Sequence, residues 1–343
     1  MRTWPSCSVV SLVCLVAVAR AEPQQHGVCL AHTWRFGVES GYGTPTAQQT
    51  LERLKKLGVD AVSLTPFGFM LSPSSDTVHL IGEHRGGESD AAVAAMARQA
   101  HARGMRVMLK PHIWIRGGEW IGAQTLRDEA GWARWFESYG AFIVHYARLA
   151  EAERMETLTL GVELARASVR DRPRWQAIIR DVRAAYHGRL LYAANWDEAE
   201  HVVFWDLVDA VGVDEYQPLT SKKDASIEEL RAGWKAVVAR LQALSERTRK
   251  PIVITELGYR ARADAATAPS LWPQGDGAAR VDTAHQAACY RAALEALTAA
   301  PFVHGIYVWK WFTDSHDEEG PTDFSPAGKP AEQVMGEFYR KMR

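Results

Sequence analysis

The chain has 343 residues, of which 47% are hydrophobic and 24% are charged, and its formal net charge at pH 7 is -1. This length and composition are sufficient for a large buried core. The near-neutral charge gives no indication of a nucleic-acid-binding protein or of a protein held on an anionic membrane, so we expect neither partner.

The first 21 residues have the pattern of a secretory signal peptide. Arg2 supplies a positive start, residues 9–18 form a nearly unbroken apolar run, and residues 19–21 (Ala-Arg-Ala) offer a cleavage site between small residues. The run is too short to span a bilayer stably. We therefore predict a signal peptide over 1–21, a mature chain over 22–343 without membrane insertion, and a secreted or periplasmic location. A lipid anchor on Cys14 is the less favoured alternative.

Removal of this segment leaves two cysteines, Cys29 and Cys289. Two cysteines form neither a disulfide framework nor a zinc site. Two buried free thiols are favoured over a single bridge.

The mature chain alternates between short apolar segments rich in β-branched residues and amphipathic helical patterns. Apolar segments that do not alternate strictly with polar residues are typical of strands covered on both faces. Eight such segments indicate a single-domain α/β fold, a (β/α)8 TIM barrel. An open doubly wound sheet is the alternative, but no glycine fingerprint follows the first segment. The predicted strands are 27–32, 59–67, 105–113, 156–164, 189–195, 209–216, 251–258 and 303–311.

The helical patterns carry recognisable ends. Gly58 stands where a C-terminal cap glycine is expected, and Ser89 and Gly104 are placed to begin and end a second helix. The predicted helices are 46–57, 89–103, 131–153, 226–248 and 282–299.

Two glutamates, Glu163 and Glu256, stand near the ends of two of the apolar segments. A buried carboxylate is costly unless it has a partner or a function. For either residue alone, the alternative is an ordinary solvated or ion-paired carboxylate, but a pair facing one another is what hydrolysis of a glycosidic bond requires. We therefore predict that both are catalytic.

Neighbouring side chains of a strand point to opposite faces, so parity predicts which residues accompany each glutamate. Thr159 and Gly161 share parity with Glu163, and Ile252 and Ile254 share it with Glu256. The other strands carry polar or aromatic residues on the corresponding face near their carboxyl ends. These sets are Lys110 and His112; Ala193 and Asn195; Gly212, Asp214 and Tyr216; and Gly305, Tyr307 and Trp309.

The chemistry alone leaves the roles of the two glutamates open. A retaining mechanism needs carboxyl groups about 5–5.5 Å apart and an inverting one about 6.5–9.5 Å. The acid requires a raised pKa, whereas the nucleophile must be kept ionised by donors. Tyr216 is a candidate donor to Glu256, although a tyrosine at the barrel rim can equally pack against a loop. Asp214 and Glu215 are further carboxylates nearby.

Thirteen tryptophans are present, and several lie at strand ends or in the loops that follow. Indole rings stack on the apolar faces of sugars and also donate a hydrogen bond. Core packing explains such residues equally well, except for Trp309, whose parity points inward. The predicted substrate-binding residues are Lys110, His112, Trp114, Asn195, Tyr216 and Trp309.

Other catalytic classes lack their motifs. His112 stands without a His-x-His or His-Glu-x-x-His pattern, so no metal site is expected, and a metal-dependent amidohydrolase lacks its ligand histidines. No Gly-x-Ser-x-Gly elbow of a serine hydrolase occurs. We expect no cofactor.

Several motifs together resemble glycoside hydrolase family 113, the β-mannanase-type barrels of the large retaining (β/α)8 clan. They are AVSLTPFGFM, HARGMRVMLKPHIWI, LGVEL, YAANWD, DEYQPL, PIVITELGY and SPAGKPAEQVM, and they extend over nearly all of the mature chain.

This resemblance implies that Glu163 is the acid/base and Glu256 the nucleophile of a double displacement with retention. It also implies that Tyr216 contacts the nucleophile and that Trp309 floors the subsite of the cleaved sugar. Many members of the clan carry Asn directly before the acid/base, where this chain has Val162. The change removes a usual hydrogen bond to the sugar 2-hydroxyl.

We therefore expect a monomeric retaining hydrolase that cleaves β-mannosidic linkages in mannan or manno-oligosaccharides. One alternative is the same machinery acting on another β-glycan. The other is a non-catalytic carbohydrate-binding barrel, against which the presence of both glutamates argues.

Overall fold

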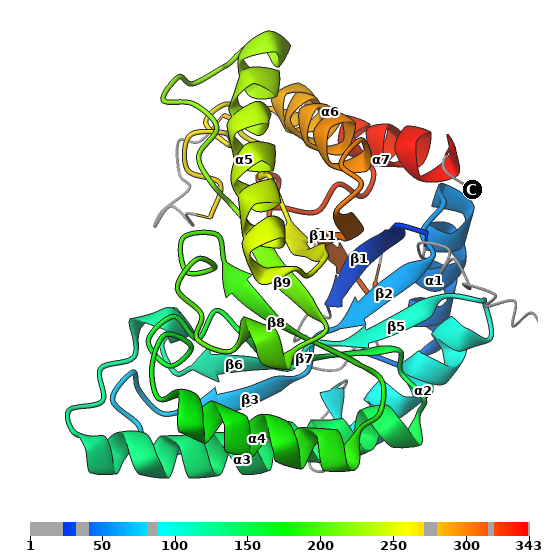
Figure 1. Ribbon diagram of the computed structural model, residues 1–343. Helices are drawn as coiled ribbons and strands as arrows, with labels where there is room; N and C mark the ends of the chain where they lie inside the picture. The colour runs from blue at the N-terminus through cyan, green and yellow to red at the C-terminus, as the bar shows by residue number, and fades with distance from the viewer. Residues whose placement is uncertain (1–22, 32–40, 81–87, 271–279, 315–318, 342–343) are drawn as a thin grey trace, which may run out of the picture.

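The computed structural model describes residues 23–31, 41–80, 88–270, 280–314 and 319–341, so the predicted signal peptide lies outside the described residues. Eight parallel strands close into a barrel in the order β1-β11-β10-β9-β8-β7-β5-β2, and helices surround it (Figure 1). The predicted barrel is confirmed. Its strands are β1 (Gln25–Ala31), β2 (Ala61–Leu64), β5 (Arg106–Leu109), β7 (Thr157–Val162), β8 (Arg189–Asn195), β9 (Ala210–Glu215), β10 (Ile252–Leu257) and β11 (Val303–Phe312).

The described residues contain seven α-helices. Five of them match the predicted helices to within two residues at each end, whereas α4 and α7 had no predicted bounds. The helices are α1 (Pro45–Leu57), α2 (Asp90–His101), α3 (Glu129–Ala152), α4 (Arg172–Ala185), α5 (Ile227–Thr248), α6 (Thr283–Thr298) and α7 (Pro330–Lys341).

The predicted helix caps are found in the structure. Gly58 ends α1 with φ 105°, a left-handed conformation that favours glycine, and its N–H donates to carbonyl oxygens of the last helical turn. Ser89 begins α2, where its side chain accepts a hydrogen bond from the N–H of Ala92.

One crossover differs from the expected strand–helix alternation. The connection from β8 to β9 contains only a short 3-10 turn, η3 (Trp205–Leu207), and no α-helix. The chain just after β8 is instead held by a buried carboxylate, Glu198, which accepts a hydrogen bond from the N–H of Asn195.

Two predicted strands each divide into two. Pro66 lies two residues after the end of β2, and Pro111 lies two residues after the end of β5. After each proline the chain enters a separate sheet. Because proline lacks the N–H that a sheet ladder needs, it commonly marks such a break. The second sheet has the order β4-β3-β6 and extends beyond β2 and β5 (Figure 1). Its strands are β3 (Phe67–Met70), β4 (His79–Leu80) and β6 (His112–Ile115).

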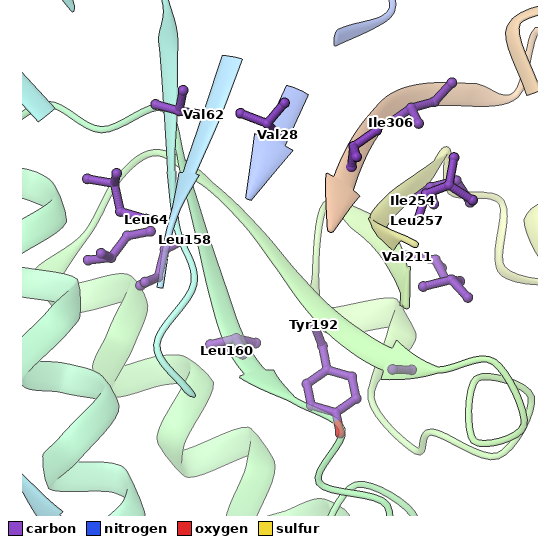
Figure 2. Packing of buried hydrophobic residues seen from close by; sticks show 14 of the residues in the cluster. Val28, Val62, Leu64, Leu158, Leu160, Tyr192, Val211, Ile254, Leu257 and Ile306 are labelled. Atoms are coloured by element: carbon purple, nitrogen blue, oxygen red, sulfur yellow. The ribbon is translucent and has the colours of Figure 1, made fainter. Parts of the chain in front are cut away.

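The core has two layers. Large aliphatic and aromatic side chains fill the space between the barrel and its helices, and Figure 2 shows a part of this layer. The barrel interior holds a smaller cluster that includes Cys29, Ala61 and Val253. Cys29 and Cys289 are both buried and free, as expected. In the described part of the chain, no helix combines the length and the apolar character that a membrane span requires.

Candidate active site

Glu163 and Glu256 both lie at the carboxyl ends of barrel strands, where the active sites of such barrels are built. Glu163 directly follows β7, and Glu256 is the second-to-last residue of β10. The main-chain N–H of Glu163 donates to the carbonyl oxygen of Ala193 in β8 at 2.8 Å. The φ of Glu163 is 50°, in the left-handed region, which costs a non-glycine residue about 1–3 kcal/mol and persists where the surrounding structure holds it in place.

A bulge in β10 aims Glu256 into the site. The pairing of β10 with β9 shifts register between Ile254 and Glu256. Ile252 and Ile254 belong to the outer layer, whereas the Thr255 hydroxyl donates to buried Asp214 at 2.6 Å. The prediction that Ile252 and Ile254 share the face of Glu256 is therefore wrong, because strict alternation does not hold across a bulge.

A similar irregularity precedes Glu163. The register between β7 and β8 shifts between Thr159 and Val162. A Cβ atom at Gly161 would lie 2.5 Å from the Tyr139 hydroxyl of α3 and 2.7 Å from a methyl of Leu164. Gly161 thus faces the helical layer, and its predicted place beside Glu163 is wrong for the same reason.

Glu256 is 5% exposed and contacts a cation and a hydroxyl donor. Lys110 Nζ donates to Oε1 at 2.5 Å, and the Tyr216 hydroxyl donates to Oε2 at 2.7 Å. Charge-assisted hydrogen bonds of this kind stabilise the ionised form of a carboxyl group. The structure thus brings Lys110 and Tyr216 to Glu256.

Glu163 has a different environment. Trp120 Nε1 donates to its Oε2 at 2.5 Å. Burial, followed by the negative charges of Asp214 and Glu256, raises the pKa of Glu163 well above the ordinary value of a glutamate. Burial and these negative charges thus favour the protonated form of Glu163, which is the form that an acid requires.

Lys110 is wholly buried and is shared between two carboxylates. Besides Glu256 it contacts Asp214 Oδ1 at 3.3 Å. Burial and the charge of Glu256 raise the pKa of Asp214 to about 7. With no exposed surface in the structure, Lys110 lies beneath the carboxylates, and we interpret it as a residue that holds Glu256 rather than one that contacts sugar.

His112 and Trp309 form an aromatic layer beside Glu256. Their rings stack with centroids 5.6 Å apart, and His112 Nε2 lies 3.8 Å from Glu256 Oε1. Burial, with the nearby ammonium groups of Lys110 and Lys310, holds the pKa of His112 well below its ordinary value. His112 is therefore a neutral ring at physiological pH.

Trp114 and Asn195 lie further out. Trp114 is 51% exposed in β6, and its ring packs edge-on against Phe67 with the ring centroids 6.4 Å apart. Asn195 ends β8, pairs with Asp214 across the sheet, and accepts a hydrogen bond from the N–H of Trp196 at 2.8 Å. Both lie on the carboxyl side of the barrel, and their interactions within the described residues are with neighbours other than Glu163 and Glu256.

A buried network fixes the chain around Glu163. The Leu164 N–H donates to the Tyr192 hydroxyl at 2.7 Å, and that hydroxyl donates to Glu198. The Ser168 hydroxyl and the Asn195 N–H also donate to Glu198. Burial raises the pKa of Glu198 to about 7. This carboxyl group thus ties the turn after Glu163 to the end of β8.

The contact of Trp120 with Glu163 and the role of Glu198 were not predicted from the sequence. Trp120 is 43% exposed in the loop after β6, and it reaches the glutamate from 43 residues away in the chain. The only signal was its place among the tryptophans near strand ends. Glu198 follows Asn195 by three residues, but no pattern in the sequence indicates that it is buried.

Comparison with solved structures identifies close relatives in fold. A GH113 β-mannanase, AaManA from Alicyclobacillus acidocaldarius in complex with ManMIm, superposes with a TM-score of 0.81 at 27% identity, covering 94% of this chain and 98% of that one. Another GH113 β-1,4-mannanase gives 0.79 at 25% identity, covering 93% and 99%. A glycoside hydrolase family 5 mannosidase from Rhizomucor miehei gives 0.60 at 9% identity, covering 93% of each chain, and shows the shared fold alone.

No curated protein sequence gives a significant match to the chain. The model of Glycoside Hydrolase Family 113, however, matches residues 32–329. This range includes both glutamates and Lys110, Tyr216 and Trp120, which donate hydrogen bonds to them. The chain therefore belongs to glycoside hydrolase family 113.

Proposed function

We propose that this glycosidase hydrolyses β-mannosidic linkages in mannan or manno-oligosaccharides by a double displacement with retention. Glu256 attacks the anomeric carbon and Glu163 protonates the leaving oxygen. Glu163, after losing its proton, then activates the water that releases the sugar. The observation that carries this proposal is the contrast between the two carboxyl groups. Lys110 and Tyr216 stabilise charge on Glu256, and burial raises the pKa of Glu163.

The choice of mannan rests on the relatives, because the solved GH113 structures are described as β-mannanases. The aromatic layer of His112 and Trp309 beside Glu256 offers an apolar surface for a sugar ring. We propose that Trp309 floors the subsite of the cleaved sugar, with Trp114 and Asn195 on its outer rim.

A reducing-sugar assay of the purified protein on mannan, glucomannan, xylan and β-glucan tests this function. We expect new reducing ends chiefly from mannan and glucomannan, and proton NMR of the first product should show the β-anomer. Turnover of xylan or β-glucan alone would contradict the mannan assignment, and an initial α-anomer would contradict retention.

A second candidate is the same machinery acting on another β-glycan. The observation that favours it is Val162, which precedes Glu163 and cannot hydrogen-bond a 2-hydroxyl. Axial and equatorial 2-hydroxyl groups are then less strongly distinguished. Relative values of kcat/KM for matched manno- and gluco-oligosaccharides measure this directly.

We also propose that residues 1–21 direct export, that the enzyme acts outside the cytoplasm, and that it is a monomer. The positive start and apolar run of this segment support export. Intact mass of the protein recovered from the medium or periplasm should show cleavage after Ala21. Light scattering should give the mass of one chain, and a dimer would contradict the monomer.

A further inference from the structure

Asp214 is a third carboxylate in the site, and its hydrogen bonds leave one of its oxygen atoms unused. It lies in β9 with 0% exposure. Its Oδ1 accepts from the Thr255 hydroxyl at 2.6 Å and from Lys110 Nζ at 3.3 Å. Its Oδ2 is buried without a hydrogen-bond partner among the described residues. A carboxylate that served only to tie strands together would be expected to use both oxygen atoms.

Lys110 is the cation that Asp214 shares with Glu256. The ammonium lies 2.5 Å from Glu256 and 3.3 Å from Asp214, so Glu256 is the closer partner. The ammonium also donates to the carbonyl oxygen of Thr255 at 3.3 Å. A wholly buried ammonium is strongly destabilising when it loses its counter-ion.

The proposed reaction removes the closer partner. When Glu256 bonds to the anomeric carbon, the bond to the leaving oxygen breaks and the proton of Glu163 moves to that oxygen. The carboxylate of Glu256 becomes a neutral ester, and the negative charge now resides on Glu163. We propose that Asp214 is a positioning residue that serves as the counter-ion of Lys110 while Glu256 carries the sugar. This inference rests on the proposed double displacement.

The charges around Asp214 support this role. The groups that face it are Lys110, Glu256 and Glu163, with Cys29 and Tyr216 nearby. Burial and the charge of Glu256 raise the pKa of Asp214 to about 7. Once Glu163 has regained a proton from solvent, as its raised pKa favours, the ester leaves no charge on Glu256, so the pKa of Asp214 falls. Below neutral pH, Asp214 then releases its proton to solvent and pairs with Lys110 as a full anion.

The first test uses the wild-type enzyme. A 2-deoxy-2-fluoro-β-mannosyl fluoride, which forms a slowly hydrolysed ester, traps the glycosyl-enzyme in protein labelled with carboxyl-13C aspartate. We expect an aspartate resonance that titrates near neutral pH in the free enzyme to titrate at least about one pH unit lower in the adduct. An unchanged titration in a fully labelled adduct would overturn the inference. If no adduct formed, the double displacement itself would fail.

The second test is kinetic and uses Asp214→Asn, which keeps the shape and removes the charge. Stopped-flow measurements with 2,4-dinitrophenyl β-mannoside separate the two steps. Ester formation should slow about 10–100-fold, because Lys110 would lack a counter-ion in the product. Breakdown of the ester should not slow, because it restores the charge of Glu256.

The matched control is Thr255→Val, which removes the other hydrogen bond to Asp214 Oδ1 and keeps the carboxyl group of Asp214, and it is compared above the pKa of Asp214, where that group is ionised. We expect it to slow ester formation less than about threefold. Equal slowing of both steps in Asp214→Asn, or equal effects of the two variants on ester formation, would indicate a merely structural role and overturn the inference.

Discussion

The two glutamates of the site occupy opposite kinds of environment. Glu256 is 5% exposed and receives hydrogen bonds from Lys110 and Tyr216. Glu163 lies on a left-handed turn, and its donor is the half-exposed Trp120. Two chemically identical side chains thus meet different donors, and burial raises the pKa of Glu163, which suits the proposed division into an acid and a nucleophile.

The supports behind the two glutamates differ as well. Behind Glu256 there are charged groups, Lys110 and Asp214, at the centre of the barrel. Behind Glu163 there is a hydrogen-bonded network that leads through Leu164 and Tyr192 to Glu198. The charged groups determine the electrostatic environment of Glu256, whereas the hydrogen-bonded network fixes the main chain just after Glu163.

The largest expected effect is that of Glu256→Ala. Without a nucleophile, hydrolysis of mannan should fall at least about a thousandfold, because the covalent route is closed. Azide should restore turnover of an activated β-mannoside and give an α-mannosyl azide, measured by NMR. Full activity, or rescue with a β-azide product, would contradict the role of Glu256.

Glu163→Ala should show which step needs the acid. Hydrolysis of mannan should fall about 100–1,000-fold, whereas ester formation from 2,4-dinitrophenyl β-mannoside should be nearly unchanged, because that leaving group needs no proton. Stopped-flow rates on the two substrates measure the contrast. Equal losses on both would contradict an acid role.

Lys110→Met tests the charged support of Glu256. We expect a loss in kcat/KM of about a hundredfold and a lower melting temperature, because two buried carboxylates lose their cation. Lys310→Met is the matched control. Lys310 lies 5.3 Å from the Trp309 ring, as Lys110 does at 5.6 Å, but it pairs with Glu319. The control should lose less than about tenfold, and equal losses would show that Lys110 acts only through packing on Trp309.

Trp120→Phe tests the hydrogen bond to Glu163 and has the smallest expected effect. The indole N–H stabilises the ionised form of Glu163, so its loss should raise the pKa of Glu163 further. Activity on manno-oligosaccharides is lost as pH rises through this pKa, because the acid must be protonated. The alkaline limb of the kcat/KM profile should therefore move to higher pH, with a loss at neutral pH below about tenfold. A limb that moved to lower pH would contradict the assignment of Trp120.

Local patterns in the sequence predicted much of this molecule. Eight apolar segments and caps such as Gly58 and Ser89 indicated the barrel because each signal depends only on neighbouring residues. The same holds for the two strand-end glutamates. Parity failed at Ile254 and Gly161, because bulges depend on pairing with the adjacent strand.

The contacts between distant parts of the chain were not predictable in this way. The bond from Trp120 to Glu163 and the pairing of Lys110 with Asp214 each join segments far apart in sequence. Lys110 was predicted to contact substrate because its parity placed it in the site. Parity does not distinguish a residue beneath the carboxylates from one that faces the sugar.

The most direct test of the assigned roles is to locate the covalent intermediate. The enzyme is inactivated with 2-deoxy-2-fluoro-β-mannosyl fluoride, digested, and analysed by mass spectrometry. We predict a single mannosyl label on the peptide that contains Glu256, at that residue. A label on Glu163 or Asp214, or hydrolysis of mannan by an enzyme that never forms an adduct, would contradict the account.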